Sequence, residues 1–251
     1  MTSFLKNITA RELTKQYASS EGKSLDLAQL NIQPSKITGI LGPNGAGKTT
    51  LISIMCGLLD PTTGSVKFEL EDGSILEGKK LKGRIGFVPQ DFAFYDELSP
   101  KQNLDYFGAM YDLDRSQIAE RSYELLTTFG LSEVANKRIR TFSGGMKRRV
   151  NLALGIIHRP EILFLDEPTV GVDVQSRMTI LKYLVSLKDE GTTIIYSSHH
   201  LNEAQELCDD LVLIDHGKVI EQGSPDAILS RSQADRLETV FLELTGEELR
   251  D

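Results

Sequence analysis

The segment Gly42-Pro43-Asn44-Gly45-Ala46-Gly47-Lys48-Thr49 has the residue types and the spacing of a phosphate-binding loop. An apolar run before it, residues 37–41, predicts a buried strand, and residues 48–55 after it are helix-like. In the pattern Gly-x-x-x-x-Gly-Lys-Ser/Thr, backbone N–H groups and the positive end of the helix face phosphate oxygens. Lys48 is then placed to reach the β- and γ-phosphates, and the Thr49 hydroxyl to bind Mg²⁺. A glycine-rich turn that binds nothing is the alternative, and the flanking strand and helix favour a nucleotide site.

Two adjacent carboxylates, Asp166 and Glu167, follow the uninterrupted apolar run 162–165. Such a run is typical of a strand buried on both faces of a parallel sheet, and ligands bind at the carboxyl ends of such strands. Asp166 is therefore a candidate to hold Mg²⁺, directly or through water. Glu167 is a candidate general base for a water molecule near the γ-phosphate. A solvated strand end is the alternative, and the phosphate loop upstream disfavours it.

Gln90 and His199 also follow predicted strands, residues 85–89 and 193–198. Gln90 could contact Mg²⁺ or the attacking water, or it could be an ordinary loop residue. His199 is placed to sense the γ-phosphate. If His199 and His200 continue the strand, their side chains point to opposite faces, so we do not expect them to share a metal. We interpret His200 as structural or exposed.

Ser143 and two glycines open a helix-like segment, residues 146–157, which must end before Pro160. Ser143 is at an N-cap position, and Gly144 and Gly145 expose backbone N–H groups at the positive end of that helix. This predicts a second anion site, far along the chain from the first. One ATP does not need two such sites within one subunit. A head-to-tail dimer accounts for both, because each serine-capped helix closes over the nucleotide held by the other subunit; a plain helix cap is the alternative.

In these motifs and in their order, the chain resembles the nucleotide-binding subunit of an ATP-binding cassette (ABC) transporter over nearly its whole length. The matching segments are the Walker A loop 42–50, the Q-loop residue Gln90, the signature 142–146, the end of the Walker B motif 165–167, the D-loop 171–173 and the switch histidine His199. Phe142 and Met146 replace the Leu and Gln that are usual in the signature, and Val170 replaces a Ser or Ala before the D-loop glycine. The catalytic positions match, so hydrolysis is still expected.

The resemblance assigns a role to each matching residue. It implies catalytic roles for Glu167, His199 and Gln90, a D-loop role for Asp173, and Mg²⁺ ligation by Thr49, Gln90 and Asp166. It implies that Ser143, Gly144 and Gly145 contact the ATP of the partner subunit. The residues implied in ATP binding are Tyr17, Gly42, Pro43, Asn44, Gly45, Ala46, Gly47, Lys48, Thr49 and Thr50. Tyr17 lies where the family usually has an aromatic residue that stacks on adenine, and a buried strand tyrosine is the alternative.

Three further segments, 146–149, 169–173 and 240–246, resemble a bacterial branch of the family whose members power the export of drugs, antibiotics, lipids or polysaccharides. This implies an ATPase subunit that uses ATP and Mg²⁺ to drive a membrane exporter. The implied partners are a second ABC ATPase subunit and a separate polytopic permease. The second subunit is another copy or a related cassette, and each chain has the full set of parts for a homodimer.

The composition agrees with one large core, since 40% of the 251 residues are hydrophobic and 25% are charged. Alternating helical and strand patterns predict an α/β fold. No run approaches the ~20 apolar residues that span a bilayer, so we expect a cytoplasmic subunit, peripheral on the cytoplasmic face of the cell membrane. The net charge of −8 gives no support for nucleic-acid binding. Cys56 and Cys208 are expected to be reduced core thiols.

We expect one ABC ATPase domain over residues 1–251. Its core is predicted as a P-loop NTPase fold, interrupted at about 91–140 by a helical insertion and followed at about 224–251 by a helical tail. The resemblance also implies an antiparallel β subdomain. Within the insertion, residues 100–107 and 118–129 are helix-like. Near the tail, residues 210–222 predict a hairpin that turns at His216-Gly217.

Phe92, Phe94 and Tyr95 crowd directly after Gln90, in a segment that also carries acidic residues. Aromatic residues of this density suit a partner groove. We predict that this region receives a short helix of the membrane subunit, and packing against the helical insertion is the alternative.

The sequence leaves two other functions as hypotheses. A soluble ABC-type ATPase that acts in cofactor assembly or on another macromolecule is the second hypothesis, since the length of the chain does not exclude it. A monomeric P-loop GTPase or kinase is disfavoured, because the sequence has no Asn-Lys-x-Asp guanine motif and such a protein leaves the Ser143 motif unexplained.

Overall fold

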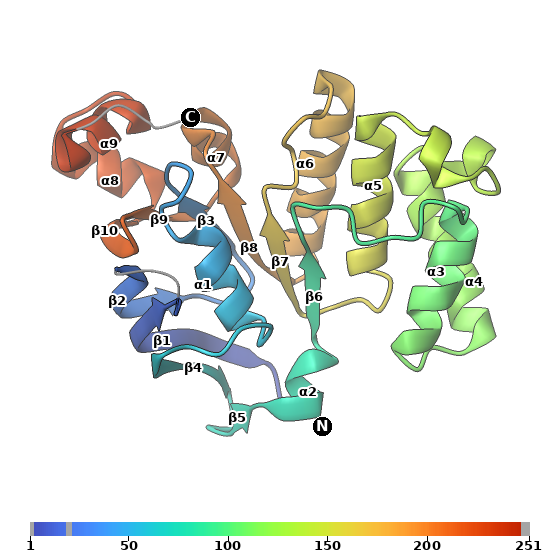
Figure 1. Cartoon of the computed structure of the whole chain (residues 1–251), viewed down its shortest axis with the longest axis horizontal. Coiled ribbons are helices and arrows are strands. Elements are labelled where there is room, and N and C mark those ends of the chain that lie inside the picture. Colours follow the sequence, from blue (N-terminus) through green and yellow to red (C-terminus); the bar gives the residue numbers. More distant parts are fainter. Residues whose placement is uncertain (1–2, 19–21, 247–251) are drawn as a thin grey trace.

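A largely parallel β-sheet carries the segments in which the site residues lie (Figure 1). The computed structural model of the chain describes residues 3–18 and 22–246. In these ranges the larger sheet has the strand order β10-β9-β3-β8-β7-β6, and β10 is antiparallel to β9 while the other neighbours are parallel. Its strands are β3 (Ile37–Leu41), β6 (Ile85–Val88), β7 (Ile162–Asp166), β8 (Thr193–Ser198), β9 (Asp210–Asp215) and β10 (Lys218–Gly223). All four apolar runs that predicted strands form strands, and the α/β class is confirmed.

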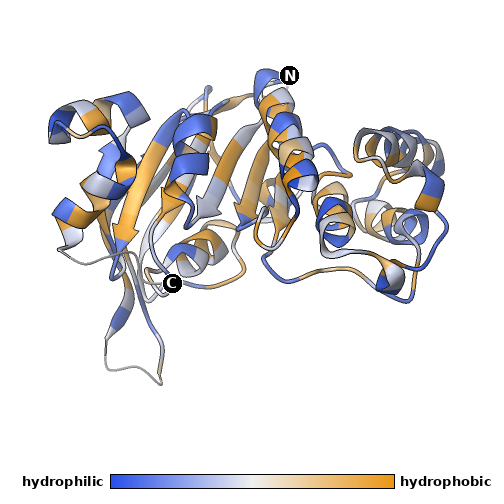
Figure 2. Cartoon of the chain, turned by 90° about the horizontal axis from the view of Figure 1, so that it is seen from above, coloured by the Kyte–Doolittle hydropathy of each residue, from blue (hydrophilic) through white to orange (hydrophobic). Residues whose placement is uncertain are grey.

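The alternation of side chains along each strand divides the core into two layers. In β7, Leu163 and Leu165 belong to the hydrophobic cluster on one face of the sheet, and Ile162 and Phe164 belong to the cluster on the other. Full burial of one such side chain stabilises the fold by about 1.5–3 kcal/mol. Figure 2 shows these strands as hydrophobic ribbons between helices. The strands are therefore buried on both faces, as the apolar runs predict.

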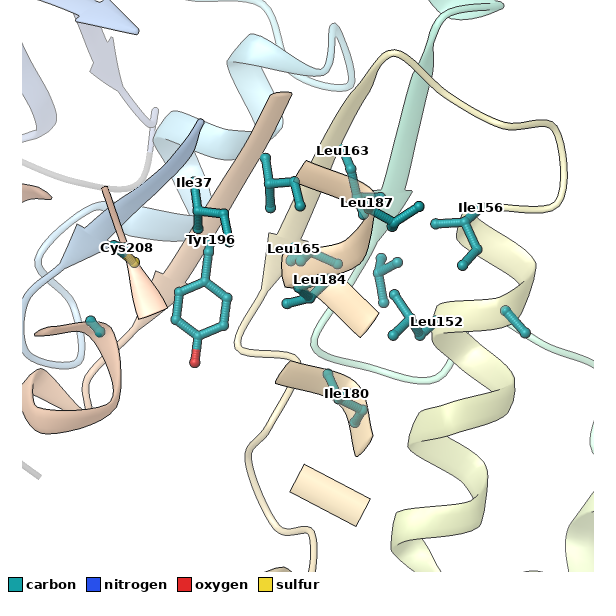
Figure 3. Packing of buried hydrophobic residues seen from close by; sticks show 14 of the residues in the cluster. Ile37, Leu152, Ile156, Leu163, Leu165, Ile180, Leu184, Leu187, Tyr196 and Cys208 are labelled. Atoms are coloured by element: carbon teal, nitrogen blue, oxygen red, sulfur yellow. The ribbon is translucent and has the colours of Figure 1, made fainter. Parts of the chain in front are cut away.

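Helices on opposite faces of the sheet carry the two predicted anion sites. Helix α1 (Lys48–Met55) packs into the cluster with Phe164, whereas α5 (Gly144–Gly155) and α6 (Val174–Asp189) pack into the cluster with Leu165. Figure 3 shows the second packing, with leucine and isoleucine side chains of α5 and α6 facing those of β7. The sheet thus separates the N-terminus of α1 from that of α5.

A smaller antiparallel sheet has the order β2-β1-β4-β5 in the described residues, as the resemblance implies. Its strands are β1 (Leu5–Gln16), β2 (Lys23–Ile32), β4 (Thr63–Leu70) and β5 (Ile75–Leu76). The short helix α2 (Gly78–Lys82) leads from it to β6. Hydrogen bonds Asp26 N–Gly217 O (2.8 Å) and Gly217 N–Ala46 O (2.9 Å) place the β9–β10 turn between this sheet and the glycine-rich loop.

The helix-like segments between β6 and β7 form α3 (Pro100–Met110) and α4 (Arg115–Thr128), followed by short 3₁₀ helices at Ser132–Val134 and Ile139–Thr141. A capping box opens each α-helix, with Ser99 and Gln102 at α3 and with Asp114 and Gln117 at α4. Figure 1 shows both helices beside α5, beyond the β6 edge of the sheet. The delimitation of this segment as an insertion stays a prediction.

After β8 the chain forms α7 (Leu201–Leu207), the β9–β10 hairpin at His216-Gly217, α8 (Pro225–Ser232) and α9 (Leu237–Thr245). The hairpin is confirmed. The predicted helical tail extends to residue 251, and its last five residues lie outside the described ranges. Within residues 3–18 and 22–246, no helix combines the length and the apolar character needed to cross a membrane. Both Cys56 and Cys208 are buried and free, as expected.

His158, in the turn after α5, joins α3 to the sheet. Its ring stacks on Tyr111 with centroids 3.6 Å apart and planes 4° apart, and Nε2 lies 2.9 Å from the carbonyl oxygen of Ile85. A carbonyl only accepts, so Nε2 carries the hydrogen that is donated. Burial lowers the pKa of His158 to about 4.

We expect this histidine to make the fold acid-sensitive. Because the folded pKa of about 4 lies below the ordinary value of 6.5, the unfolded chain binds the proton first. Stability is therefore lost as the pH falls below 6.5, by up to about 3 kcal/mol near pH 4. Urea unfolding at pH 7.5 and 5.0 should show a smaller loss for His158→Gln than for the wild type, with the exposed His216 mutated to Gln as the control. Equal losses in the wild type and His158→Gln would assign the effect to other groups.

Candidate functional site

The glycine-rich loop, residues 42–47, turns sharply between β3 and α1. Gly42 passes so close to β9 that a Cβ atom there would lie 2.1 Å from the carbonyl oxygen of Ile214. Gly47 is the N-cap of α1 with φ of 104°, and a Cβ atom there would lie 2.7 Å from the carbonyl oxygen of Ser24. Only glycine fits both positions. The loop therefore curls tightly at the positive end of α1, which is the arrangement that binds phosphate.

Lys48 lies folded against this loop. Its Nζ donates hydrogen bonds to the carbonyl oxygens of Gly42 (2.8 Å) and Pro43 (3.1 Å) and lies 3.4 Å from Oε1 of Glu167. The side chains of Lys48 and Glu167 are only 5% and 6% exposed. Burial lowers the pKa of Lys48, and the neighbouring Glu167 carboxylate opposes that shift by raising it. The ammonium is thus held at the phosphate loop and beside the predicted general base.

Asp166 and Glu167 are held by Ser197, which is opposite Asp166 in the register of β7 with β8. Ser197 Oγ donates to Oδ1 of Asp166 (2.6 Å) and accepts from the backbone N–H of Glu167 (3.0 Å). Glu167 has φ of 49°, in the left-handed region that costs a residue other than glycine about 1–3 kcal/mol. The carboxylate that follows this strained turn lies between Nζ of Lys48 and Nδ1 of His199. Ser197 was not predicted as a site residue, and only its small polar character at a strand end could have indicated it.

His199 lies on the other side of the Glu167 carboxylate, with Nδ1 3.3 Å from Oε2. The Nδ1 atom is buried and makes no aligned hydrogen bond with any described residue. β8 ends at Ser198, so the two histidines do not continue the strand. The condition for opposed side chains is therefore not met, and the rings of His199 and His200 lie 4.1 Å apart. His200 is exposed, as predicted.

Residues 44–50, Gln90 and Glu167 of the predicted site meet at a hollow of about 360 Å³, whereas Asp166 and His199 are not part of its described lining. Its described lining consists of Ser24, Asn44, Gly45, Ala46, Gly47, Lys48, Thr49, Thr50, Gln90 and Glu167. Gln90 reaches it from the bend after β6. A larger cleft of about 670 Å³ near Phe4, Pro34 and Arg159 contains none of the predicted site residues among its described lining.

Tyr17 lies beside the phosphate loop, whereas Asp173 lies beside Gly145 at the start of α5. Tyr17 follows β1, is 40% exposed, and has its hydroxyl 3.4 Å from Oγ1 of Thr50; the alternative of a buried strand tyrosine is wrong. Asp173 caps α6, and its carboxylate accepts from the backbone N–H (2.8 Å) and the hydroxyl (2.9 Å) of Ser176. These hydrogen bonds lower the pKa of Asp173.

The serine-capped helix is present but lies apart from the hollow. α5 begins at Gly144, and Ser143 Oγ accepts from the backbone N–H of Met146 (3.3 Å), so the predicted N-cap is confirmed. Ser143 and Gly144 are exposed. Among the described residues, the Ser143–Gly145 turn does not line the hollow. The chain therefore presents a second helix N-terminus to solvent, on the opposite face of the sheet from the first.

The polar residues in the hollow, together with Asp166 next to Glu167, fit a nucleoside triphosphate with Mg²⁺. The Thr49 hydroxyl, the Gln90 amide and the Asp166 carboxylate offer the hard oxygen ligands that Mg²⁺ prefers. The described residues hold no cluster of three or more His, Cys, Asp or Glu that could bind a metal by itself. That agrees with an ion held by few protein ligands together with phosphate oxygens. The unbonded Nδ1 of His199 is a further buried polar atom for a ligand to satisfy.

Comparison with known proteins gives consistent matches. The family model described as ABC transporter matches residues 25–170. The linearmycin resistance ATP-binding protein LnrL of Bacillus subtilis is 43% identical over 202 residues, which cover 79% of this chain and 64% of that protein. The daunorubicin resistance ATP-binding protein DrrA3 of Streptomyces coeruleorubidus is 37% identical over 236 residues, covering 94% of this chain and 74% of that protein. This chain thus spans less than two thirds of the first relative.

Solved structures agree. A structure of the ATP-binding subunit of an ABC transporter matches with a TM-score of 0.84 at 25% identity, covering 95% of this chain and 99% of the other. A dimeric ATP-binding cassette in a post-hydrolysis state, bound to ADP and Pi, matches with a TM-score of 0.77 at 26% identity, covering 87% of this chain and 98% of the other.

Proposed function

Because this chain belongs to the ABC transporter family, we propose that it is the ATPase subunit of a membrane exporter and works as a head-to-tail dimer. The observation that carries the proposal is the pair of separated anion sites. The phosphate loop and Lys48 lie at one face of the sheet, whereas Ser143 caps an exposed helix N-terminus at the other. A second subunit, rotated by 180°, brings its Ser143–Gly145 turn to the first subunit's hollow. Two copies of this chain then enclose two nucleotides.

The chemistry proposed for each subunit uses the residues around the hollow. Lys48 leaves its carbonyl partners to contact the β- and γ-phosphates of ATP. Glu167 accepts a proton from the attacking water as the new O–P bond forms and the bond to the ADP oxygen breaks. His199 orients the same carboxylate through Nδ1, which lies 3.3 Å from Oε2 of Glu167. When bound, Mg²⁺ neutralises phosphate charge, and Thr49, Gln90 and Asp166 are the residues that would hold it.

Tyr17 is proposed to stack on the adenine ring. The side chain is 40% exposed beside the phosphate loop, with its hydroxyl 3.4 Å from Oγ1 of Thr50 and Nζ of Lys15 over the ring at 5.5 Å. Stacking of a base on an aromatic side chain contributes about 1–3 kcal/mol.

The export direction is supported by the relatives whose names refer to drug resistance. The proposed location is the cytoplasmic face of the membrane, where a separate permease holds the dimer. A tagged Glu167→Gln chain, isolated from detergent-solubilised membranes of its native host with ATP present, tests this. We expect a polytopic membrane protein at equal stoichiometry. A soluble dimer without a membrane partner would instead favour the ATPase that acts in cofactor assembly.

The proposed docking site for the permease is an aromatic groove, defined by the exposed side chains of Leu58, Phe92, Tyr95, Tyr106 and Met110. A hollow of about 380 Å³ is lined by Leu58 and Met110 but, among the described residues, not by the three aromatic side chains. Acidic residues adjoin the aromatic side (Asp91, Asp96, Glu97 and Asp105). We therefore propose a short amphipathic helix of the permease with basic residues on its polar face as the occupant.

The three aromatic residues that follow Gln90 differ in how deeply they are buried. Phe94 is half-buried and packs against the hydrophobic core. The alternative, packing against the helical insertion, describes Tyr95, whose ring contacts α3. Phe92 stacks on Phe94 at 5.3 Å between centroids, and Tyr95 meets Tyr106 of α3 edge to face at 5.2 Å. Phe92 and Tyr95 both remain exposed. Substitutions of Phe92 and Tyr95 therefore test partner contact more directly than a substitution of Phe94, whose ring stacks on Phe92.

Truncation of the groove should separate assembly from catalysis. For Phe92→Ala and Tyr95→Ala we expect at least tenfold less permease to copurify with the chain, because buried aromatic anchors dominate interface energies. ATP hydrolysis by the purified chain should persist. Tyr123→Ala, on the exposed face of α4, is the matched control. If Phe94→Ala and both other variants left assembly and transport intact, the groove would have no role in coupling.

A further inference from the structure

A buried carboxylate outside the nucleotide hollow connects three elements of the site. Glu203, in α7, is 2% exposed. Its Oε1 accepts hydrogen bonds from the hydroxyl of Thr169 (2.8 Å) and from the hydroxyl of Tyr196, and its Oε2 forms an ion pair with Nε of Arg177. Neither Glu203 nor its three partners lines the hollow in the described part of the chain.

Each partner comes from a segment that carries a site residue. Thr169 lies two residues beyond Glu167, in the turn closed by the hydrogen bond Val170 N–Glu167 O (3.3 Å). Tyr196 lies in β8, one residue before Ser197, and its hydroxyl is also 3.2 Å from Oγ1 of Thr169. Figure 3 shows the Tyr196 ring projecting from β8, with the hydroxyl at its far end.

Arg177 connects the same carboxylate to the D-loop. It lies in the first turn of α6, where its backbone N–H donates to the carbonyl oxygen of Asp173 (2.9 Å). Glu203 itself lies in the first turn of α7, and the next residue, Ala204, donates its N–H to the carbonyl oxygen of His200 (3.2 Å). The network thus ties the Glu167 turn and the D-loop to the segment that follows His199.

The free energy of burial argues against a purely stabilising role. A carboxylate taken out of water is costly, and a buried ion pair often stabilises no more than a well-packed apolar group of the same size. Leu201 and Ala204, which flank Glu203 in α7, already pack into the hydrophobic core. The carboxylate of Glu203 instead provides directional contacts, which hold the hydroxyls of Thr169 and Tyr196 and the guanidinium of Arg177 in one geometry.

We propose that Glu203 is a positioning residue for ATP hydrolysis, which fixes the Glu167 turn relative to His199 and to the D-loop. This inference rests on the proposed ATPase function. A displacement of about 1 Å of a catalytic group can cost a factor of about 10² in rate. Loss of the Glu203 contacts should therefore slow hydrolysis while leaving the phosphate loop, and so ATP binding, unchanged.

Steady-state ATPase kinetics of the purified chain test the proposal. For Glu203→Gln, which keeps the size of the side chain and removes its charge, we expect kcat to fall about tenfold with KM for ATP within about twofold of the wild type. Glu206→Gln makes the same change on the exposed face of the same helix and should match the wild type. A purely structural role would give Glu203→Gln a lower unfolding temperature with an unchanged kcat for the folded fraction, and that result would overturn the proposal.

A second variant covers the case in which Glu203→Gln does not fold. Arg177 is 42% exposed at its side chain, so water can solvate the site after Arg177→Gln. We expect this variant also to lower kcat about tenfold. The loss of kcat in the double variant should be smaller than the product of the losses in the two single variants, because both substitutions remove the same contact. A wild-type kcat in Arg177→Gln and in any folded Glu203→Gln would contradict the positioning role of Glu203 and leave the proposed ATPase function standing. A wild type without ATP turnover would contradict the proposed function itself.

Discussion

Replacement of Glu167 by Gln is expected to lower the ATP turnover number by about 10² to 10⁴-fold, the contribution typical of a general base. Glutamine has the size of glutamate and can still accept a hydrogen bond from Lys48, so the hollow should keep its shape. It cannot take a proton from water. ATP binding should therefore persist while hydrolysis stops. Turnover can be measured as phosphate release at saturating ATP, and binding by calorimetry.

The control for this variant is Glu206→Gln, the exposed substitution on α7, which should hydrolyse ATP at the wild-type rate. Wild-type turnover in Glu167→Gln would refute the assignment of the base. Glu167 combines a strained backbone with two contacts, Nζ of Lys48 at 3.4 Å and Nδ1 of His199 at 3.3 Å, which place its carboxylate beside the phosphate loop.

Replacement of Lys48 by Met is expected to weaken ATP binding by about 10²-fold and to abolish turnover. A hydrogen bond to a charged group contributes about 1.5–3 kcal/mol, and Lys48 is the cation that the loop holds at the phosphate site. Burial already lowers the pKa of Lys48, so its ammonium is costly to keep in the folded chain. The Met variant also leaves the buried Glu167 carboxylate and two loop carbonyl oxygens without the ammonium, so its unfolding temperature is expected to fall.

Calorimetric titration with ATP measures the dissociation constant for this variant, and Lys79→Met, on the exposed surface of α2, is the matched control. A wild-type dissociation constant in Lys48→Met would show that the phosphates bind elsewhere. Together with the Glu167 variant, this experiment separates binding from chemistry at two side chains that contact each other in the hollow.

The local parts of this site were predictable from sequence because their signals are local. The apolar run before Gly42, the glycine spacing and Lys48 all lie within a dozen residues, and they form β3, the loop and α1 as predicted. The Ser143 cap was predictable for the same reason, since an N-cap is decided by three residues.

The long-range parts were not predictable. Ser197 holds Asp166 through the register of β7 with β8, across 31 residues of sequence, and a shift of that register by one residue would turn it away. The left-handed conformation of Glu167 has no marker in its residue type. Glu203 has the residue type of a surface helix position, and its carboxylate is buried among its partners only because α6, α7 and β8 pack together.

The central claim, that ATP joins two subunits through each other's Ser143 motif, is tested most directly by light scattering of purified Glu167→Gln. Without nucleotide the protein should have the 27.9-kDa mass of one chain, and with ATP and Mg²⁺ it should have twice that mass. Ser143→Arg added to the same protein should leave it a monomer that still binds ATP. If Glu167→Gln stayed a monomer while saturated with ATP, or if Ser143→Arg did not disturb its dimer, dimerisation through the Ser143 motif would be contradicted.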